Sequence, residues 1–147
     1  MINGISTNGA HMAIDFQGLC PLISVYDMPE SIHFYRDLLG FEVISHSPLL
    51  SSGSFHWGWL RKNGAELMLN THYEHNDERP PERSREWLRA HGDVTFYLRC
   101  PDVDGAYDQL RALGLKVEEP RVAPYGMKQL NFRDPDGYGL CFQWQVS

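Results

Sequence analysis

The sequence has no long apolar run. Its uninterrupted apolar stretches are only a few residues long, far short of the roughly 20 residues that a membrane-spanning helix needs. Near the N-terminus no basic segment precedes an apolar one, so we expect no secretory signal. These absences predict a protein with no membrane partner.

Basic residues are also few. The chain has 13 Lys and Arg against 19 Asp and Glu, which gives a formal net charge of −6. A surface with this balance repels the phosphate backbone, so we expect no nucleic-acid partner. The same balance weakly favours neutral or cationic ligands.

Cysteine is scarce and follows no pattern. The chain has three cysteines, Cys20, Cys100 and Cys141, and an odd number cannot all pair within one chain. None of them belongs to a Cys-x-x-Cys motif. We therefore predict a reducing, cytoplasmic location in which the cysteines serve as small core residues.

Aromatic residues, by contrast, are plentiful. Phe, Trp and Tyr make up 12% of the chain. Large flat side chains usually fill a core, and they also line pockets for flat apolar ligands. The four tryptophans are Trp57, Trp59, Trp87 and Trp144.

The length of 147 residues fits one domain. Residues 1–18 are rich in Gly, Asn and Ser, so we expect a flexible leader that holds at most a short strand at 13–16. The folded domain is then predicted to cover residues 19–147.

The first half of this domain is predicted to be β-α-β-β-β. Its helix begins after Asp27, a residue type that caps helix N-termini, and stops at Gly40. Asn63-Gly64, a dipeptide typical of tight hairpins, separates the last two strands. The predicted strands cover residues 22–26, 41–44, 55–60 and 66–70.

The second half repeats this order. Asp102 follows Asp27 by 75 residues, and Gly114 follows Gly40 by 74. A near-constant offset indicates an internal duplication. The predicted strands cover residues 94–100, 115–117, 129–132 and 140–144.

A linker at residues 72–92 separates the two halves, and we predict one short helix in it at 82–90. Acidic residues are interspersed among its arginines, so a solvated helix face is favoured over an anion site. The modules on either side are then 19–71 and 93–146. The linker arginines are Arg79, Arg83, Arg85 and Arg89.

Two motifs give the chain a family resemblance. One is VYDMPES at residues 25–31, followed by Phe34-Tyr35 and Leu39-Gly40-Phe41, and the other is FRDPDGY at 132–138. With the duplicated element order, the chain resembles the vicinal oxygen chelate superfamily, which includes glyoxalase I, bleomycin resistance proteins and extradiol dioxygenases. The resemblance covers about residues 19–146.

The resemblance implies an α+β fold of two tandem βαβββ modules. Each module would curl a mixed four-stranded sheet into a half-open barrel. The resemblance also implies a homodimer and a ligand cavity inside the curled sheets.

The resemblance further locates four positions at which metalloenzymes of the superfamily carry His or Glu. Counted from the motifs, these are Cys20, Met68, Thr95 and Cys141. Two thiols, a thioether and a hydroxyl do not supply the donors that a hard divalent ion needs. We therefore expect no metal and no other cofactor. A soft metal or a thiol pair at Cys20 and Cys141 is the alternative to buried apolar cysteines.

A cavity without a metal remains, and strand alternation indicates which side chains line it. Met, Trp, Tyr, Arg and Gln together suit a flat, partly polar organic ligand, and the alternative is that they fill a closed core. The candidate ligand-binding residues are Trp57, Trp59, Glu66, Met68, Thr95, Tyr97, Arg99, Tyr125, Met127, Cys141 and Gln143.

Three functions follow from these residues. The first is a metal-free binding protein that resembles bleomycin resistance proteins and sequesters an aromatic or cationic compound. The second is an enzyme of the same superfamily with an atypical or absent metal site, in which Glu66, His56 and Tyr97 supply acid and base groups. The third is a scaffold without a small ligand. His72 and His75 are expected to lie in a solvated loop.

Overall fold

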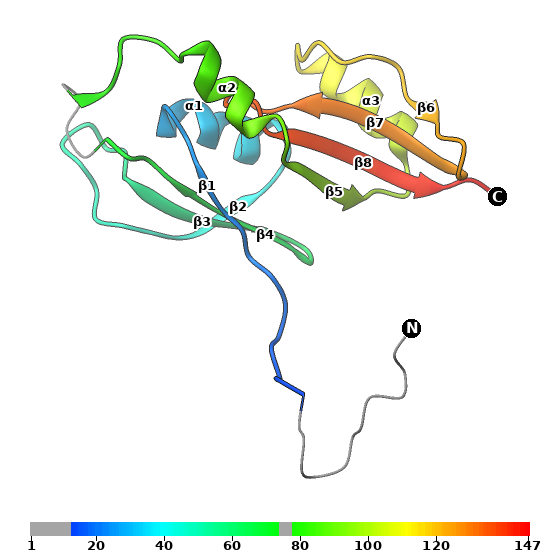
Figure 1. Ribbon diagram of the computed structural model, residues 1–147, viewed down its shortest axis with the longest axis horizontal. Coiled ribbons are helices and arrows are strands. Elements are labelled where there is room, and N and C mark those ends of the chain that lie inside the picture. Colours follow the sequence, from blue (N-terminus) through cyan, green and yellow to red (C-terminus); the bar gives the residue numbers. More distant parts are fainter. Residues whose placement is uncertain (1–12, 74–77) are drawn as a thin grey trace.

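The computed structural model describes residues 13–73 and 78–147, so most of the predicted leader, and His75, lie outside the described residues. Two four-stranded sheets lie side by side, with the helices above them (Figure 1). Residues 13–16 form no strand, and Ile14 and Phe16 are exposed, so the short strand predicted there is wrong. No helix in the described part of the chain is long and apolar enough to cross a membrane.

The first sheet has the order β1-β4-β3-β2. β1 pairs with β4 in parallel, and the other neighbours are antiparallel. Asn63, with a φ of 53°, and Gly64 form the predicted two-residue hairpin between β3 and β4. The bounds are β1 Leu22–Ser24, β2 Glu42–His46, β3 Trp57–Lys62 and β4 Ala65–Asn70.

The second sheet repeats this topology with the order β5-β8-β7-β6, again with a parallel first pair. The predicted fold of two tandem βαβββ modules in mixed, half-open sheets is therefore confirmed. The bounds are β5 Thr95–Arg99, β6 Arg121–Val122, β7 Met127–Arg133 and β8 Gly139–Gln145.

One strand of this sheet is displaced from its prediction. We expected it at 115–117, but β6 is at Arg121–Val122 and pairs with β7. The tight turn that closes at Ala123, whose N–H donates to the carbonyl of Met127, brings only residues 121 and 122 alongside β7. Residues 115–117 therefore remain outside the ladder although their apolar pattern is typical of a strand.

The helix of the first module begins where the sequence predicts. The Asp27 carboxylate accepts a hydrogen bond from the N–H of Glu30 at 3.0 Å, and Pro29 occupies the first turn. The helix starts as α1 (Met28–Ile32) and continues as a π-helix, η1 (His33–Leu38), until Gly40 with a φ of 84° ends it.

The other two helices have the same kind of cap. In the second module Asp102 caps α3 (Val103–Ala112) as Asp27 caps α1. In the linker Ser84 caps α2 (Arg85–His91), so this helix is shorter at its start than the predicted 82–90.

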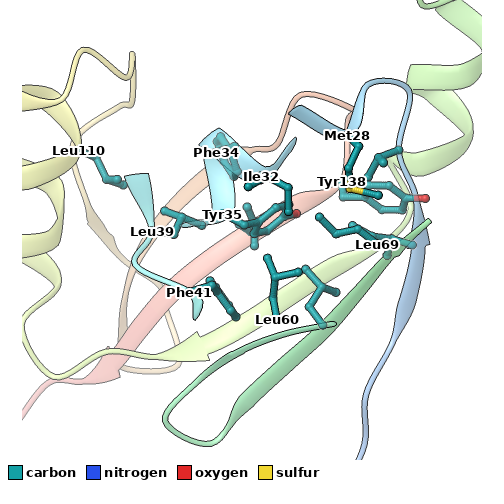
Figure 2. Packing of buried hydrophobic residues seen from close by; sticks show 14 of the residues in the cluster. Met28, Ile32, Phe34, Tyr35, Leu39, Phe41, Leu60, Leu69, Leu110 and Tyr138 are labelled. Carbon is teal, nitrogen blue, oxygen red and sulfur yellow. The ribbon is translucent and has the colours of Figure 1, made fainter. Parts of the chain in front are cut away.

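One hydrophobic core joins both modules. Tyr35, Leu60 and Leu69 of the first module are fully buried, as is Leu130 of the second sheet. Figure 2 shows Tyr35 above Leu60, with Leu69 to its right. Burial of each such side chain contributes about 1.5–3 kcal/mol, so the core fixes the helices over one face of each sheet.

The loop between β7 and β8 carries a buried polar junction between the modules. The Tyr35 hydroxyl donates to the Asp134 carboxylate at 2.6 Å, and the N–H of Tyr26 donates to Asp136 at 3.0 Å. The Tyr138 hydroxyl accepts a hydrogen bond from the N–H of Ser24 at 3.2 Å. Burial raises the pKa of Asp134 to about 6. The second sequence motif therefore joins the two modules.

Two linker arginines belong to this junction, which corrects the predicted solvated helix face. Arg83 donates to the fully buried Asp136 at 3.0 Å and also pairs with Glu30. Arg79 donates to Asp27 at 2.7 Å, and both guanidinium groups lie over the Tyr26 ring. Sequence spacing could not show this because the partners lie some 50 residues away along the chain. Arg85 and Arg89 are exposed as expected.

Candidate functional site

Each sheet has a second face that the helices do not cover. In β3 and β4 the side chains of Leu60, Leu67 and Leu69 point into the core. Strand alternation directs the residues between them to the opposite face. The same holds for β5, where Phe96 and Leu98 pack against the core and their neighbours are exposed. We call these surfaces the first open face and the second open face.

The first open face is organised around Trp59. The strand register places Trp59 opposite Met68 and Trp57 opposite Asn70. The indole Nε1 of Trp59 donates to the Glu66 carboxylate at 2.9 Å. This hydrogen bond fixes a flat apolar ring and a negative charge side by side.

Two further groups surround this pair. The Arg61 guanidinium lies 5.8 Å from the centre of the Trp59 ring and 3.8 Å from the Glu66 carboxylate. Cys20 is also close, since burial raises the pKa of its thiol and the Glu66 carboxylate adds to that rise. Leu22, which is 55% exposed, extends the row of Trp59 and Met68 across β1.

The second open face is more polar. Tyr97 of β5 lies opposite Cys141, and Arg99 lies opposite Gln143. The side-chain amide of Gln129 donates to the side-chain oxygen (Oε1) of Gln143 at 2.9 Å and to the Tyr125 hydroxyl at 3.0 Å. Tyr97 and Tyr125 are 57% and 69% exposed, so both rings are accessible.

The predicted ligand-binding residues are thus divided between two faces. The first open face carries Trp57, Trp59, Glu66 and Met68. The strand register places six others on the second open face, namely Thr95, Tyr97, Arg99, Met127, Cys141 and Gln143. Tyr125 lies at the edge of that face. The sheets are separate and side by side, so in a single chain these residues do not enclose one cavity (Figure 1).

The family metal positions do not form a metal site within the described residues. Cys20 precedes β1 beside Glu66, whereas Cys141 is fully buried in the other sheet beside Tyr97. In the described ranges no group of three or more His, Cys, Asp or Glu residues is placed so that it could hold a metal ion. The donor set at these positions does not fit a hard divalent ion. Each described cysteine is a free thiol.

The structure brings together one pair that the sequence did not single out. The Ser24 hydroxyl and His72 Nε2 are 2.6 Å apart at the end of the first sheet. The parallel register that sets Ser24 beside Asn70 also brings His72, two residues further on, to the same place. The sequence predicted only that His72 lies in a solvated loop. The pairing with Ser24 could not be predicted because it depends on the register between β1 and β4.

The acid and base groups considered for an enzyme are not brought together. Glu66 is on β4 and Tyr97 is on β5, in different sheets. His56 precedes β3, where its Nδ1 lies 3.3 Å from the Thr71 hydroxyl. Within one chain these three residues do not form a catalytic group.

The family model of the Glyoxalase/Bleomycin resistance protein/Dioxygenase superfamily matches residues 11–142. The chain belongs to this superfamily. The resemblance seen in the two sequence motifs is therefore confirmed. No curated protein matches the chain.

Several solved structures share the fold. SMU.1112c is 32% identical, with a TM-score of 0.68 over 88% of this chain and 100% of its own. TnmS3, an antibiotic-binding protein from Streptomyces sp. CB03234, is 26% identical, with a TM-score of 0.60 over 92% of this chain and 100% of its own. TioX from Micromonospora sp. ML1 is 19% identical, with a TM-score of 0.66 over 89% of this chain and 100% of its own. At that identity the likeness shows a shared fold and nothing further.

Proposed function

We propose that this superfamily member is a metal-free binding protein that sequesters a planar organic compound, aromatic or cationic, between two open faces. The observation that carries the proposal is the pair of Trp59 and Glu66, which presents a flat ring beside a fixed negative charge. Stacking adds about 0.5–1.5 kcal/mol per aromatic pair beyond area burial, and the carboxylate attracts a cationic group on the same ligand.

A second copy of the chain completes the site in this proposal. One open face covers only one side of a planar ring, whereas small-molecule sites bury about 70–90% of their ligand. The first open face of one protomer would lie against the second open face of its partner. A homodimer would also cover the exposed rings of Tyr97 and Tyr125 and the exposed Leu22.

The likeness to TnmS3 supports the class of ligand, since that protein binds an antibiotic. The net charge of −6 is compatible with a cationic compound. A reducing, cytoplasmic location remains part of the proposal, in keeping with the free thiols of the described cysteines.

A fluorescence titration tests the proposal. A panel of planar antibiotics, including cationic glycopeptides, is added to the wild type and to Trp59→Phe. We expect at least one compound to change tryptophan fluorescence and the variant to bind it more weakly. Trp144→Phe is the matched control because Trp144 and Gln143 are neighbours on β8 that point to opposite faces. If no compound binds, or if both variants lose affinity equally, the first open face is not the site.

An enzymatic function is the second candidate, because the hydroxyl of Ser24 meets His72 at 2.6 Å. An imidazole in that position can accept the proton of an attacking hydroxyl. A fluorophosphonate probe separates the two functions. Covalent labelling of the wild type but not of Ser24→Ala would favour the enzyme, and an unlabelled wild type would favour the binding protein.

A further inference from the structure

A cleft lies between the two modules and meets the second open face at Tyr97 and Arg99. Its volume is about 520 Å³, within the roughly 300–1,000 Å³ of small-molecule sites. The β3–β4 hairpin and the end of η1 form one wall, and β5 with α3 forms the other. Figure 1 shows the β3–β4 hairpin reaching toward β5.

The floor of the cleft is apolar and comes from both modules. Figure 2 shows Leu110 extending from α3 toward Leu39 at the end of η1. Leu98 and Phe142 pair across β5 and β8 on the core side of the second sheet, opposite to Tyr97 and Cys141. The apolar residues of the floor are Leu38, Leu39, Phe41, Leu98, Leu110 and Phe142.

The rim of the cleft carries two positively charged side chains. Lys62 comes from the β3–β4 hairpin and Arg99 from the end of β5. Within the described residues neither side chain has a carboxylate within 4 Å, and Lys62 Nζ donates only to the carbonyl of Leu39 at 3.3 Å. The nearby Asp102 carboxylate is engaged in capping α3, where it accepts from the N–H of Gly105 at 2.9 Å.

The charge of Lys62 reaches the half-buried Cys100, which also lines the cleft. Burial raises the pKa of the Cys100 thiol, the negative charge of Asp102 adds to that rise, and the positive charge of Lys62 opposes it. The rim therefore presents positive charge above an apolar floor.

We infer that the cleft binds an amphipathic monocarboxylate, with its carboxylate between Lys62 and Arg99 and its hydrocarbon part on the apolar floor. The two cations select against a neutral head group, and the leucine-rich floor selects for an aliphatic body. Because both modules line the cleft, the ligand also stabilises their packing against each other. This site shares Arg99 with the second open face, but Lys62 and the apolar floor lie outside the planar-ligand site, so the inference does not depend on that proposal.

Calorimetric titration of the full chain with decanoate tests this inference, with decanol as the uncharged comparison. We expect decanoate to bind and to raise the melting temperature. Lys62→Gln should weaken decanoate about threefold to fivefold, as one partly exposed charge contributes, and leave decanol within about twofold. Lys116→Gln is the matched control, because Lys116 is an exposed lysine outside the cleft.

A second variant tests the floor. Ala106 lies on α3 and lines the cleft, so Ala106→Leu narrows the cleft with a residue that favours helices. We expect this variant to fold, as circular dichroism would show, and to lose most of its affinity for decanoate. The inference is overturned if decanoate does not bind, if Lys62→Gln and Lys116→Gln weaken it equally, or if folded Ala106→Leu binds it as the wild type does.

Discussion

The hydroxyl of Tyr35 donates a 2.6 Å hydrogen bond to the Asp134 carboxylate across the junction between the modules. Tyr35 is fully buried in the helix of the first module, and Asp134 begins the turn between β7 and β8 of the second. The same carboxylate accepts hydrogen bonds from the N–H groups of Asp136 and Tyr138. One buried carboxylate therefore links the helix of the first module to the turn of the second.

Removal of the Tyr35 hydroxyl should destabilise the fold. In Tyr35→Phe the buried Asp134 carboxylate loses a donor, which costs about 1–3 kcal/mol of the free energy of unfolding. Urea unfolding measures the loss. Tyr107→Phe is the control, because the Tyr107 hydroxyl accepts a hydrogen bond from the exposed Arg111, and its loss should lower the free energy of unfolding by well under 1 kcal/mol. Equal stability of Tyr35→Phe and wild type would contradict the proposed importance of the junction.

The stability of the protein should depend on pH through Asp134. Burial raises its pKa from 3.8 to about 6 in the folded state, so between these values the folded protein holds a proton that the unfolded chain has lost. Asp134 therefore raises the free energy of unfolding as pH falls from 6 toward 4, by about 3 kcal/mol over the whole range.

Urea unfolding across that range, for the wild type and for Asp134→Asn, isolates this contribution from that of the other carboxylates. The difference in free energy between the two proteins should change with pH between 4 and 6 and stay constant above 7. A difference that is flat throughout would contradict the raised pKa of Asp134.

Arg83 should contribute to stability more than an ordinary linker arginine. It neutralises Asp136, whose side chain is fully buried, and it also pairs with Glu30. In Arg83→Ala the Asp136 carboxylate keeps only neutral hydrogen-bond donors. We expect this variant to lose about 2 kcal/mol of the free energy of unfolding. Arg85→Ala, two residues away and exposed, should cost less than about 0.5 kcal/mol. Thermal denaturation of the two variants makes the comparison, and similar melting temperatures would count against the junction described for Arg83.

The fold was readable from sequence because its signals are local and repeated. The caps at Asp27 and Asp102, the stop at Gly40 and the Asn63-Gly64 hairpin each depend on a few adjacent residues, and all four were correctly located. The strand predicted at 115–117 was wrong because its pairing depends on a partner strand that an apolar pattern does not specify.

The site was readable in part. Strand alternation indicated which side chains share a face, and the register agrees for Trp57, Trp59 and Met68. It did not show that the faces belong to two separate open sheets, since that depends on how the modules pack. The Ser24–His72 pair and the cleft lined by Leu98 and Leu110 were missed for the same reason, because each joins residues far apart in the chain.

The charge of Glu66 should select among ligands. Glu66→Gln keeps an acceptor for the Trp59 indole and removes only the negative charge. We expect cationic ligands to bind about threefold to tenfold more weakly and neutral planar ligands to be unaffected. Glu86→Gln on the exposed surface of α2 is the control. Equal weakening of neutral and cationic ligands would contradict an electrostatic role for Glu66.

A second copy of the chain should be present in solution. Sedimentation at micromolar concentration should give about twice the chain mass of 16.9 kDa. Leu22→Glu, which places a charge on the first open face, should shift that equilibrium toward the monomer. A wild-type protein that sediments as a monomer would contradict the two-face site.

The central claim is that planar ligands bind between the open faces, and calorimetric titration of a compound identified in the antibiotic panel tests it most directly. Tyr97 is an exposed aromatic ring on the second open face, so Tyr97→Ala should weaken binding by about 1–3 kcal/mol if the ring anchors the ligand. Tyr107→Ala, on the outer helix α3, should leave the affinity within about twofold of wild type. Unchanged affinity in Tyr97→Ala, or equal losses in both variants, would contradict the account.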